Sequence, residues 1–390
     1  MDNISYFDTY EKNLCSGCRA CEQTCKKNAI SMIFDDEGFL YPQINEDLCV
    51  ECNACKNVCP MPKKRDEAKI IKIYELQNRN EESLKRSSSG GVFISLAKYV
   101  LNNNGVVFGT VLDDDNNAII VAADTEAELE KMQGSKYVSS NTLSTYSEVE
   151  GYLKDGKIVL FTGAPCQVAG LKCFLKKDFE NLITMDFLCH GMPSSKIFKE
   201  NIDFLAKKYK GAVSEYKFRD KSLKGWGHVT SYFVNRKKHY EPGKLNAYFY
   251  GFIKGYLNRY SCYSCPFRGE KRYSDITVGD FWGCDVTDLN LRKGVSFAAL
   301  NTAVGVSVFE KIKNEFLYKE TVPEKVAKMN SSLLSSESEH IPEVRKNIYK
   351  ELAAEGYERV MHKYLITDKR FLFKAKMKLD IILRKLSIRK

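Results

Sequence analysis

The sequence predicts three parts along the chain: a small α+β domain, a larger α/β domain and a helical C-terminal region. Three observations support this organisation. Cysteines repeat with one spacing near the N-terminus, apolar strands alternate with amphipathic helices through the middle, and Lys and Arg gather near the C-terminus. We expect the three parts to span residues 1–64, 65–325 and 326–390.

The composition is that of a globular protein. Of 390 residues, 44% are hydrophobic and 28% are charged, which excludes a disordered or collagen-like chain. No apolar run reaches the ~18 residues of a membrane-spanning helix, and the first residues lack the basic-then-apolar pattern of a signal peptide. We therefore expect a cytoplasmic protein whose 14 cysteines stay reduced, which favours metal or redox roles over disulfides.

Eight cysteines lie before residue 60 in two groups with one spacing, each cysteine having a counterpart 34 positions later (15 and 49, for example). Three cysteines at intervals of three surround one face of a four-iron cube, and the fourth ligates the other cluster. Cluster one would take Cys15, Cys18, Cys21 and Cys59, and cluster two Cys49, Cys52, Cys55 and Cys25. A pair of zinc knuckles is the alternative, although zinc needs only four ligands and leaves the third close cysteine of each group unexplained.

Residues 9–60 resemble a bacterial two-cluster ferredoxin, including Asn28-Ala29-Ile30 and the segment 36–42. One departure is Lys26, where such ferredoxins usually carry proline, whereas Pro60 keeps that place in the second repeat. The resemblance implies an α+β ferredoxin-like domain with two [4Fe–4S] clusters.

The charged segment 60–69 is typical of a linker, and alternating strands and helices follow it. The apolar patterns predict strands at 105–112, 118–123, 157–161, 182–188, 229–234 and 276–278. They predict helices at 92–101, 125–132, 166–175 and 194–209. This alternation predicts an α/β domain.

Four further cysteines lie in loops of that domain. Cys166 begins a helix after a strand, where the helix dipole favours thiolate, and Cys189 follows the next strand. Cys262 and Cys265 form a CxxC pair in a turn-rich segment. Together they are the number of ligands that a third cluster needs. For each of the first two, a buried structural thiol is the alternative, and the pair alone would also suit zinc or a redox dithiol.

The segment Ser87-Ser88-Ser89-Gly90-Gly91 precedes an apolar helix. Small residues at a helix start leave backbone N–H groups available to a phosphate. A serine N-cap is the alternative interpretation.

Seven segments in this order resemble the β-subunit family of coenzyme F420 (deazaflavin) hydrogenases and dehydrogenases. They are SSSGGVF (87–93), GSKYV (134–138), LFTGAPCQVAGL (160–171), LCHGMPS (188–194), FRDK (218–221), CYSCPFRG (262–269) and SDITVGDFWG (274–283). The same family includes 7-hydroxymethyl chlorophyll a reductase and the ferredoxin-dependent divinyl chlorophyllide reductase. The resemblance covers about residues 85–305.

The resemblance implies an α/β domain with bound FAD and a [4Fe–4S] cluster beside it. The cluster ligands that match the family's cysteine motifs are Cys166, Cys189, Cys262 and Cys265. The candidate flavin contacts are Ser89, Gly90, Gly91, Ser135 and Lys136, with the lysine near the isoalloxazine ring or a phosphate. Asp280 is a further candidate that could contact a flavin ribose, with a turn-capping role as the alternative.

His190 directly follows a proposed ligand and is the candidate catalytic residue. It could donate protons to reduced flavin or substrate, although a hydrogen bond that tunes the cluster is the favoured role. Cys173 lies seven residues after Cys166 on the same helix face and is expected in the core. Cys284 follows the last segment of the resemblance and is also expected not to be a ligand.

The last 29 residues carry +8 of the chain's formal charge of +10, from ten Lys and Arg and two Asp. Apolar residues recur there at helical spacing: Phe371, Leu372, Ala375, Leu379, Ile382, Leu383 and Leu386. The pattern predicts a basic amphipathic helix suited to an anionic membrane surface. Packing of the apolar stripe on the domain is an equally favoured alternative. Nucleic-acid binding is not expected, because no binding module accompanies the charge.

The sequence therefore predicts a cytoplasmic FAD-dependent iron–sulfur oxidoreductase, with the tail as a potential attachment to the inner membrane face. A ferredoxin-like donor or acceptor would exchange electrons with the clusters and FAD, for two-electron chemistry on an organic substrate. An electron-relay subunit that serves a catalytic partner is the first alternative. A non-enzymatic metal-binding scaffold at a membrane is the second. The substrate and the use of the deazaflavin coenzyme are not readable from the sequence.

Overall fold

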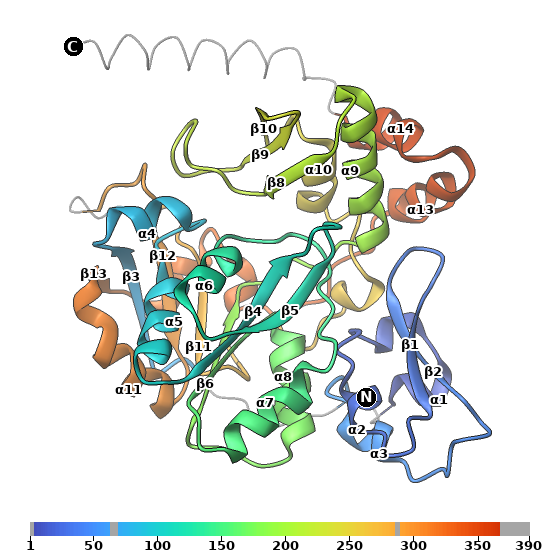
Figure 1. The fold of residues 1–390 in the computed structure, drawn as a ribbon, viewed down its shortest axis with the longest axis horizontal. Coiled ribbons are helices and arrows are strands. Elements are labelled where there is room, and N and C mark those ends of the chain that lie inside the picture. The colour runs from blue at the N-terminus through green and yellow to red at the C-terminus, as the bar shows by residue number, and fades with distance from the viewer. Residues whose placement is uncertain (1–3, 63–68, 285–288, 367–390) are drawn as a thin grey trace.

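The computed structural model describes residues 4–62, 69–284 and 289–366. It is a mixed α/β structure organised around one large mixed sheet, with two smaller sheets beside it (Figure 1). Nearly all of the predicted basic tail, residues 367–390, lies outside the described residues.

The N-terminal part holds an antiparallel pair, β1 (Ile30–Phe34) and β2 (Leu40–Ile44). Its helices are α1 (Tyr6–Thr9), α2 (Ala20–Thr24) and α3 (Ala54–Val58). The last two are 34 residues apart, and each follows a residue in the left-handed region, Arg19 (φ 64°) and Asn53 (φ 57°). The repeat of the cysteine spacing is therefore also a repeat of local structure.

The large sheet has the order β13-β3-β12-β11-β7-β6-β4-β5. Its strands are β3 (Lys72–Asn78), β4 (Val106–Leu112), β5 (Ala118–Ala123), β6 (Val159–Thr162), β7 (Leu182–Phe187), β11 (Ile276–Asp280), β12 (Ser296–Leu300) and β13 (Phe316–Glu320). The pairings show that β3, β11, β7, β6 and β4 run in one direction and the other three against it. The carboxyl ends of five strands therefore meet at one edge, where ligand sites of open α/β sheets form.

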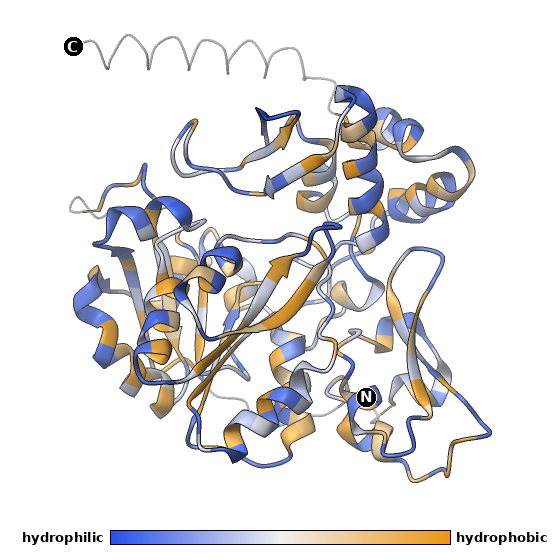
Figure 2. Cartoon of the chain, viewed as in Figure 1, coloured by the Kyte–Doolittle hydropathy of each residue, from blue (hydrophilic) through white to orange (hydrophobic). Residues whose placement is uncertain are grey.

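Helices cover both faces of this sheet (Figure 1). On one face lie α5 (Val92–Asn102), α6 (Glu126–Met132) and α11 (Ala303–Ile312), whose apolar residues share one core with the strands. On the other lie α7 (Thr145–Lys154) and α8 (Pro165–Leu175), whose core continues into the N-terminal part. Figure 2 shows the hydrophobic residues concentrated in the central strands, as expected for a sheet that is buried on both faces.

A three-stranded antiparallel sheet contains β8 (Val213–Lys217), β9 (Val229–Val234) and β10 (Lys237–Pro242). The remaining helices are α4 (Glu81–Arg86), α9 (Ser195–Tyr209), α10 (Ala247–Ile253), α12 (Pro323–Ala327), α13 (Glu343–Glu355) and α14 (Tyr357–Val360). Of the predicted strands, 229–234 belongs to this smaller sheet, while β3, β12 and β13 were not predicted. Within the described ranges, no helix combines the length and the apolar character that crossing a membrane requires.

Candidate functional site

Four cysteines of the N-terminal part lie together, although they come from both sequence repeats. Burial raises the pKa of Cys21 well above its usual value, and the neighbouring thiols of Cys18, Cys15 and Cys59 raise it further. Adjacent buried thiols cannot all ionise unless a cation compensates their charge. Iron supplies that compensation in a cluster, so these residues fit the ligand set expected for cluster one.

The second set lies closer to the surface. Burial raises the pKa of Cys55, and nearby Cys49 and Cys52 contribute in the same direction. Cys52 is exposed. Cys25 is the C-cap residue of α2, and its Sγ accepts a hydrogen bond from the Ala29 N–H at 3.3 Å. Its assignment to cluster two stays a prediction.

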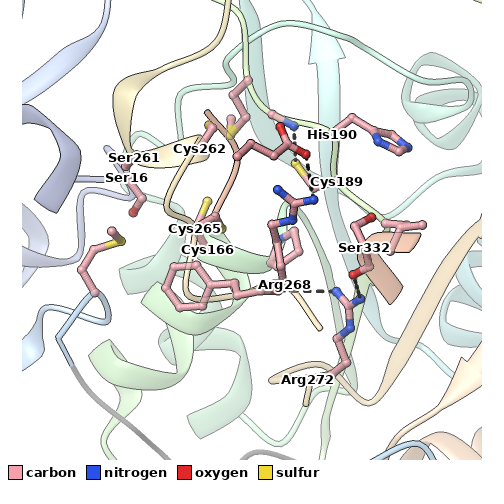
Figure 3. Close-up of a pocket in the computed structure, with 17 residues that line it drawn as sticks. Ser16, Cys166, Cys189, His190, Ser261, Cys262, Cys265, Arg268, Arg272 and Ser332 are labelled. Carbon is pink, nitrogen blue, oxygen red and sulfur yellow. Dashed lines mark hydrogen bonds and ion pairs between the residues drawn. The ribbon is translucent and has the colours of Figure 1, made fainter. Parts of the chain in front are cut away.

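The four cysteines from the α/β domain line a single pocket (Figure 3). Cys166 lies at the start of α8 after β6, and Cys189 follows β7, so both stand at the carboxyl edge of the sheet. Cys262 ends a short 3₁₀ turn, and Cys265 follows it. Burial raises the pKa of Cys166, and Cys265, Cys189 and Cys262 raise it further. The set has the ligand type and number that a four-iron cube needs, so it fits the third cluster expected from the sequence.

The loops that hold these cysteines have local reasons for their conformation. Pro165 occupies the first turn of α8, where its missing N–H costs nothing. Gly191 has φ +108°, and a Cβ on it would lie 2.2 Å from Nδ2 of Asn258. Only glycine therefore lets the loop after Cys189 approach the loop before Cys262.

Backbone N–H groups donate to cysteine sulfurs in the first and the third set. Gly17 N donates to Sγ of Cys15 at 3.4 Å, and Gly191 N donates to Sγ of Cys189 at 3.4 Å. Such bonds favour thiolate and are one of the terms that set the potential of a cluster.

Two arginines that the sequence analysis did not single out line the pocket of the third set. Arg268 forms an ion pair with Glu339 at 2.8 Å, and Arg272 donates to the Ser332 carbonyl at 3.3 Å. The Nε atoms of both arginines are buried without a hydrogen-bond partner in the described part of the chain. Their positive charge suits an anionic cluster. Arg268 belongs to the CYSCPFRG segment, which was the available signal.

Within residues 4–62, 69–284 and 289–366, no three His, Cys, Asp or Glu side chains stand close enough together to hold a single metal ion. The ligands of a four-iron cube stand further apart than those of one ion, so the three cysteine sets are compatible with cubes.

The flavin-side segments meet at an ion pair between Arg219 and Asp280, the last residue of β11. Arg219 Nη1 donates to Oδ2 of Asp280 at 2.7 Å, and the other guanidinium nitrogens reach the Ser88 and Gly227 carbonyls. Trp226 Nε1 donates to Oδ1 of the same aspartate at 2.9 Å. Segments far apart in sequence therefore form one polar network at the carboxyl edge of the sheet.

Three of the candidate flavin side chains are engaged within the protein. Ser89 Oγ donates to the Val295 carbonyl at 2.8 Å, and Asp280 is held as described. Lys136 Nζ donates to three carbonyls at the end of α6, Lys131, Met132 and Gln133, and burial lowers the pKa of this lysine to about 7. These side chains already have hydrogen-bond partners within the protein, and those contacts do not require a bound flavin.

The other candidates leave backbone groups available. A Cβ on Gly90 would lie 2.4 Å from the Leu76 carbonyl, so this glycine permits close packing on β3. Gly91, at φ +84°, is the N-cap residue of α5, and no side chain caps that helix. Ser135 N donates to Oγ of Ser88 at 2.8 Å, which joins two of the segments. The N-terminus of α5 fits a phosphate through backbone N–H groups.

His190 lies between the cysteine pocket and the polar network. It lines the pocket, and in Figure 3 its ring lies on the side away from Cys166 and Cys265. Burial lowers the pKa of His190, while the nearby carboxylates of Glu339 and Asp280 act in the opposite direction. His190 thus lies near a carboxylate of each region, since Glu339 lines the cysteine pocket and Asp280 belongs to the polar network.

The N-terminal cysteines and the third set meet across α8. A Cβ on Gly170 would lie 3.0 Å from Sγ of Cys18, and Cys166 is one helical turn earlier on α8. Cys173 is buried in the core on the same helix. Cys284 is also buried, and its Sγ donates to Oε2 of Glu75 at 3.2 Å.

Comparisons with known proteins agree with this organisation. Residues 73–146 and 156–325 match the models for the N-terminal and C-terminal parts of the coenzyme F420 hydrogenase/dehydrogenase beta subunit. The chain belongs to this family. Residues 14–62 match a 4Fe-4S dicluster domain, so this family member is an iron–sulfur protein. A comparison with curated proteins gave no match.

Among solved structures, the chain is similar to one from the xenon-derivatised F420-reducing [NiFe] hydrogenase complex of Methanosarcina barkeri. The two are 19% identical, with a TM-score of 0.46, and the match covers 77% of this chain and 93% of that one.

Proposed function

We propose that this member of the beta-subunit family is an iron–sulfur flavoprotein oxidoreductase with three [4Fe–4S] clusters and FAD. Electrons would pass between a ferredoxin-like partner and an organic substrate. Iron–sulfur cubes supply one-electron steps, and a flavin couples them to two-electron chemistry. The observation that carries the proposal is the pocket that four cysteines from three separate loops line together.

The arrangement of the cysteine sets supports an order in which electrons would pass through the three clusters. Cys52 of the second set is exposed, and the neighbouring Leu48 and Val50 are exposed apolar residues. This surface suits a docking redox partner. Cys18 of the first set packs on α8, which carries Cys166 of the third set. The partner would therefore meet cluster two, and cluster one would stand next to the third.

The flavin part of the proposal rests on the network at the carboxyl edge of the sheet. The uncapped N-terminus of α5 would hold a phosphate through backbone N–H groups, with Gly91 and Ser135 beside it. Arg219 and Asp280 would fix the surrounding segments. His190 lies between this region and the third cysteine set, where it could hold a proton for reduced flavin or substrate.

The division of the chain follows from the same proposal. Residues 1–64 would form the two-cluster domain, 65–325 the flavin and third-cluster domain, and 326–390 the helical C-terminal region. The family matches at 14–62, 73–146 and 156–325 support the first two.

Anaerobic purification followed by iron, sulfide and flavin analysis tests the proposal. We expect about twelve iron atoms per chain, from three four-iron cubes, and one FAD. Eight iron atoms would exclude the third cluster, and a protein without flavin would exclude the flavoenzyme. Bleaching of the flavin by reduced ferredoxin would exclude a non-enzymatic scaffold.

A relay subunit is the second candidate, because the family is one of beta subunits. The isolated chain would then exchange electrons with ferredoxin and reduce no organic substrate by itself. Recovery of a stoichiometric catalytic subunit whose removal abolishes substrate reduction would favour the relay over a self-sufficient reductase.

A further inference from the structure

Arg259 is a buried cation in the part of the molecule where the first and third cysteine sets meet. The residue is 2% exposed, and among the described residues it makes no ion pair with Asp or Glu within 4 Å. Its Nε donates to the Cys15 carbonyl at 2.6 Å, and Nη2 donates to the Leu40 carbonyl at 2.8 Å. A buried guanidinium without a carboxylate is costly unless another anion compensates it.

The backbone of Arg259 joins two loops of the third set. Its N–H donates to the carbonyl of Met192, three residues after Cys189, at 3.1 Å. Its carbonyl accepts from Cys262 N at 3.0 Å. One residue thus contacts loops that carry ligands of both proposed clusters.

The side chain lies directly against the loop of the first set. Gly17, between Cys15 and Cys18, has φ +72°, and a Cβ on it would lie 3.0 Å from Nη1 of Arg259. The Tyr41 ring covers the guanidinium on another side, with its centroid 3.9 Å from Cζ. Glycine at position 17 therefore permits the approach of the guanidinium to the cysteine loop.

Arg259 is positioned against both cysteine sets. Its Nε donates to the carbonyl of Cys15, and its own carbonyl accepts from the N–H of Cys262. Because arginine stays charged near neutral pH, its guanidinium is a fixed positive charge beside the Cys15 loop. Cluster thiolates and sulfides would supply the negative charge that a buried guanidinium without a carboxylate requires.

We infer that Arg259 is a positioning residue. Its positive charge stabilises the reduced forms of cluster one and of the third cluster, and so raises the reduction potential of both. Reduction adds one electron to a cube, and a nearby buried cation stabilises the added negative charge. The inference for the third cluster rests on the proposed function, whereas that for cluster one needs only the dicluster domain.

Arg345 shows the usual alternative for a buried arginine. Its guanidinium is also buried, but it pairs with both carboxylate oxygens of Glu37, at 2.6 and 3.1 Å. Among the described residues Arg259 has no such carboxylate, so a group other than Asp or Glu compensates its positive charge.

The test is a potentiometric titration of the full chain, purified without oxygen and followed by electron paramagnetic resonance. The variants are Arg259→Gln, Arg259→Lys and, as a control for net charge, Arg86→Gln at an exposed pair with Glu82. Cys52→Ala and Cys262→Ala assign the signals of cluster two and the third cluster. Iron content is measured for each protein.

For Arg259→Gln we expect one-electron reduction of cluster one and the third cluster to become about tenfold less favourable, which corresponds to 59 mV. Cluster two, Arg86→Gln and the charge-conserving Arg259→Lys should stay near wild type. Unchanged potentials in Arg259→Gln with full iron content would overturn the inference.

If Arg259→Gln does not take up iron, Arg259→Lys decides. Full iron content with wild-type potentials would support a role for the charge, whereas lost iron or shifted potentials would show that only the guanidinium hydrogen bonds matter. A wild-type protein that lacks the third signal would refute the third cluster, and the shift of cluster one would still test Arg259.

Discussion

Cys18 packs against Gly170, so that a Cβ on the glycine would lie 3.0 Å from the cysteine Cβ and Sγ. The hydroxyl of Tyr146 would lie 2.8 Å from a Cβ on Gly170. This hydroxyl donates to the Gln167 carbonyl of α8 at 2.8 Å. The loop that carries Cys18 therefore packs tightly against a helix of the α/β domain.

Replacement of Gly170 by alanine tests this contact. Alanine favours the helix, but the added methyl overlaps the Tyr146 hydroxyl, and overpacking of this kind costs about 1–3 kcal/mol. We expect a lower midpoint of unfolding and a changed resonance signal from cluster one. Gly151→Ala is the matched control, because nothing lies within 4 Å of the Cβ position in α7, and it should stabilise the protein. Equal behaviour of the two variants would argue against a tight contact.

Two cysteines of α8 should behave differently when each is replaced by alanine. Cys166→Ala should lose about four iron atoms per chain and keep the signals of the two N-terminal clusters. Cys173→Ala should keep its iron and lose only stability, because the thiol belongs to the core. Iron analysis and resonance spectra of the two proteins make the comparison. Full iron content in Cys166→Ala would contradict its assignment as a ligand.

The ion pair between Arg345 and Glu37 connects α13 to the turn between β1 and β2. Arg345→Met should cost roughly 3–5 kcal/mol, because it leaves a carboxylate that is largely buried without a partner. Adding Glu37→Gln should recover part of this loss, with a coupling of about 0.5–3 kcal/mol. Urea unfolding of the wild type, both single variants and the double variant gives the coupling directly. Additive effects would show that the pair does not hold these elements together.

Asp220 offers a prediction about pH. Burial opposes its charge, but hydrogen bonds from Lys238, Ser222 and Ser231 outweigh it and hold the pKa of Asp220 below its usual range. A lowered pKa in the folded state stabilises the fold at every pH above the unfolded value of about 3.9, and the gain is lost only as pH falls below it. The deficit of Asp220→Asn in urea unfolding should therefore be the same at pH 8 and pH 5.5.

A deficit of Asp220→Asn that shrinks between those two pH values would contradict the lowered pKa. Asp178→Asn is the control, because Asp178 is exposed and its replacement should have little effect on stability.

The basic tail gives a prediction from sequence alone. A chain shortened by residues 369–390 loses the whole +8 charge and the apolar stripe of the tail. We expect it to lose co-sedimentation with vesicles rich in anionic lipid and to keep its flavin and iron. Vesicles of neutral lipid are the control. Unchanged binding of the shortened chain to anionic vesicles would contradict membrane binding through this segment and would favour its packing on the domain.

Short-range spacing was enough to predict the dicluster domain, because each group of cysteines repeats its fixed intervals within a few residues. The same holds for the helix at 194–209, which the structure has as Ser195–Tyr209. Strand β3 escaped prediction for a physical reason. Its residues 73–78 are all buried, yet they include Glu75, Gln77 and Asn78, so the segment lacks the continuous apolar run that is typical of a strand buried on both faces.

Arg259 could not have been found from the sequence either. Its side-chain partner, the Cys15 carbonyl, is 244 residues away, and the residue lies outside every segment of the family resemblance. Strand β9 shows the same limit at the level of topology. Its bounds, Val229–Val234, were predicted, but pairing with β8 and β10 instead of the large sheet depends on contacts that local patterns do not contain.

The position of β3 bears on the order in which the protein is made. This strand pairs with β12 and β13, so the ribosome must synthesise residues 296–320 before the large sheet closes. Both N-terminal cysteine groups are complete by residue 59, and domains fold from the N-terminus as they emerge. The proposed clusters one and two would therefore have all their ligands synthesised first, whereas the third set must wait for a long-range closure of the sheet. Maturation of the three proposed clusters would then proceed in two stages.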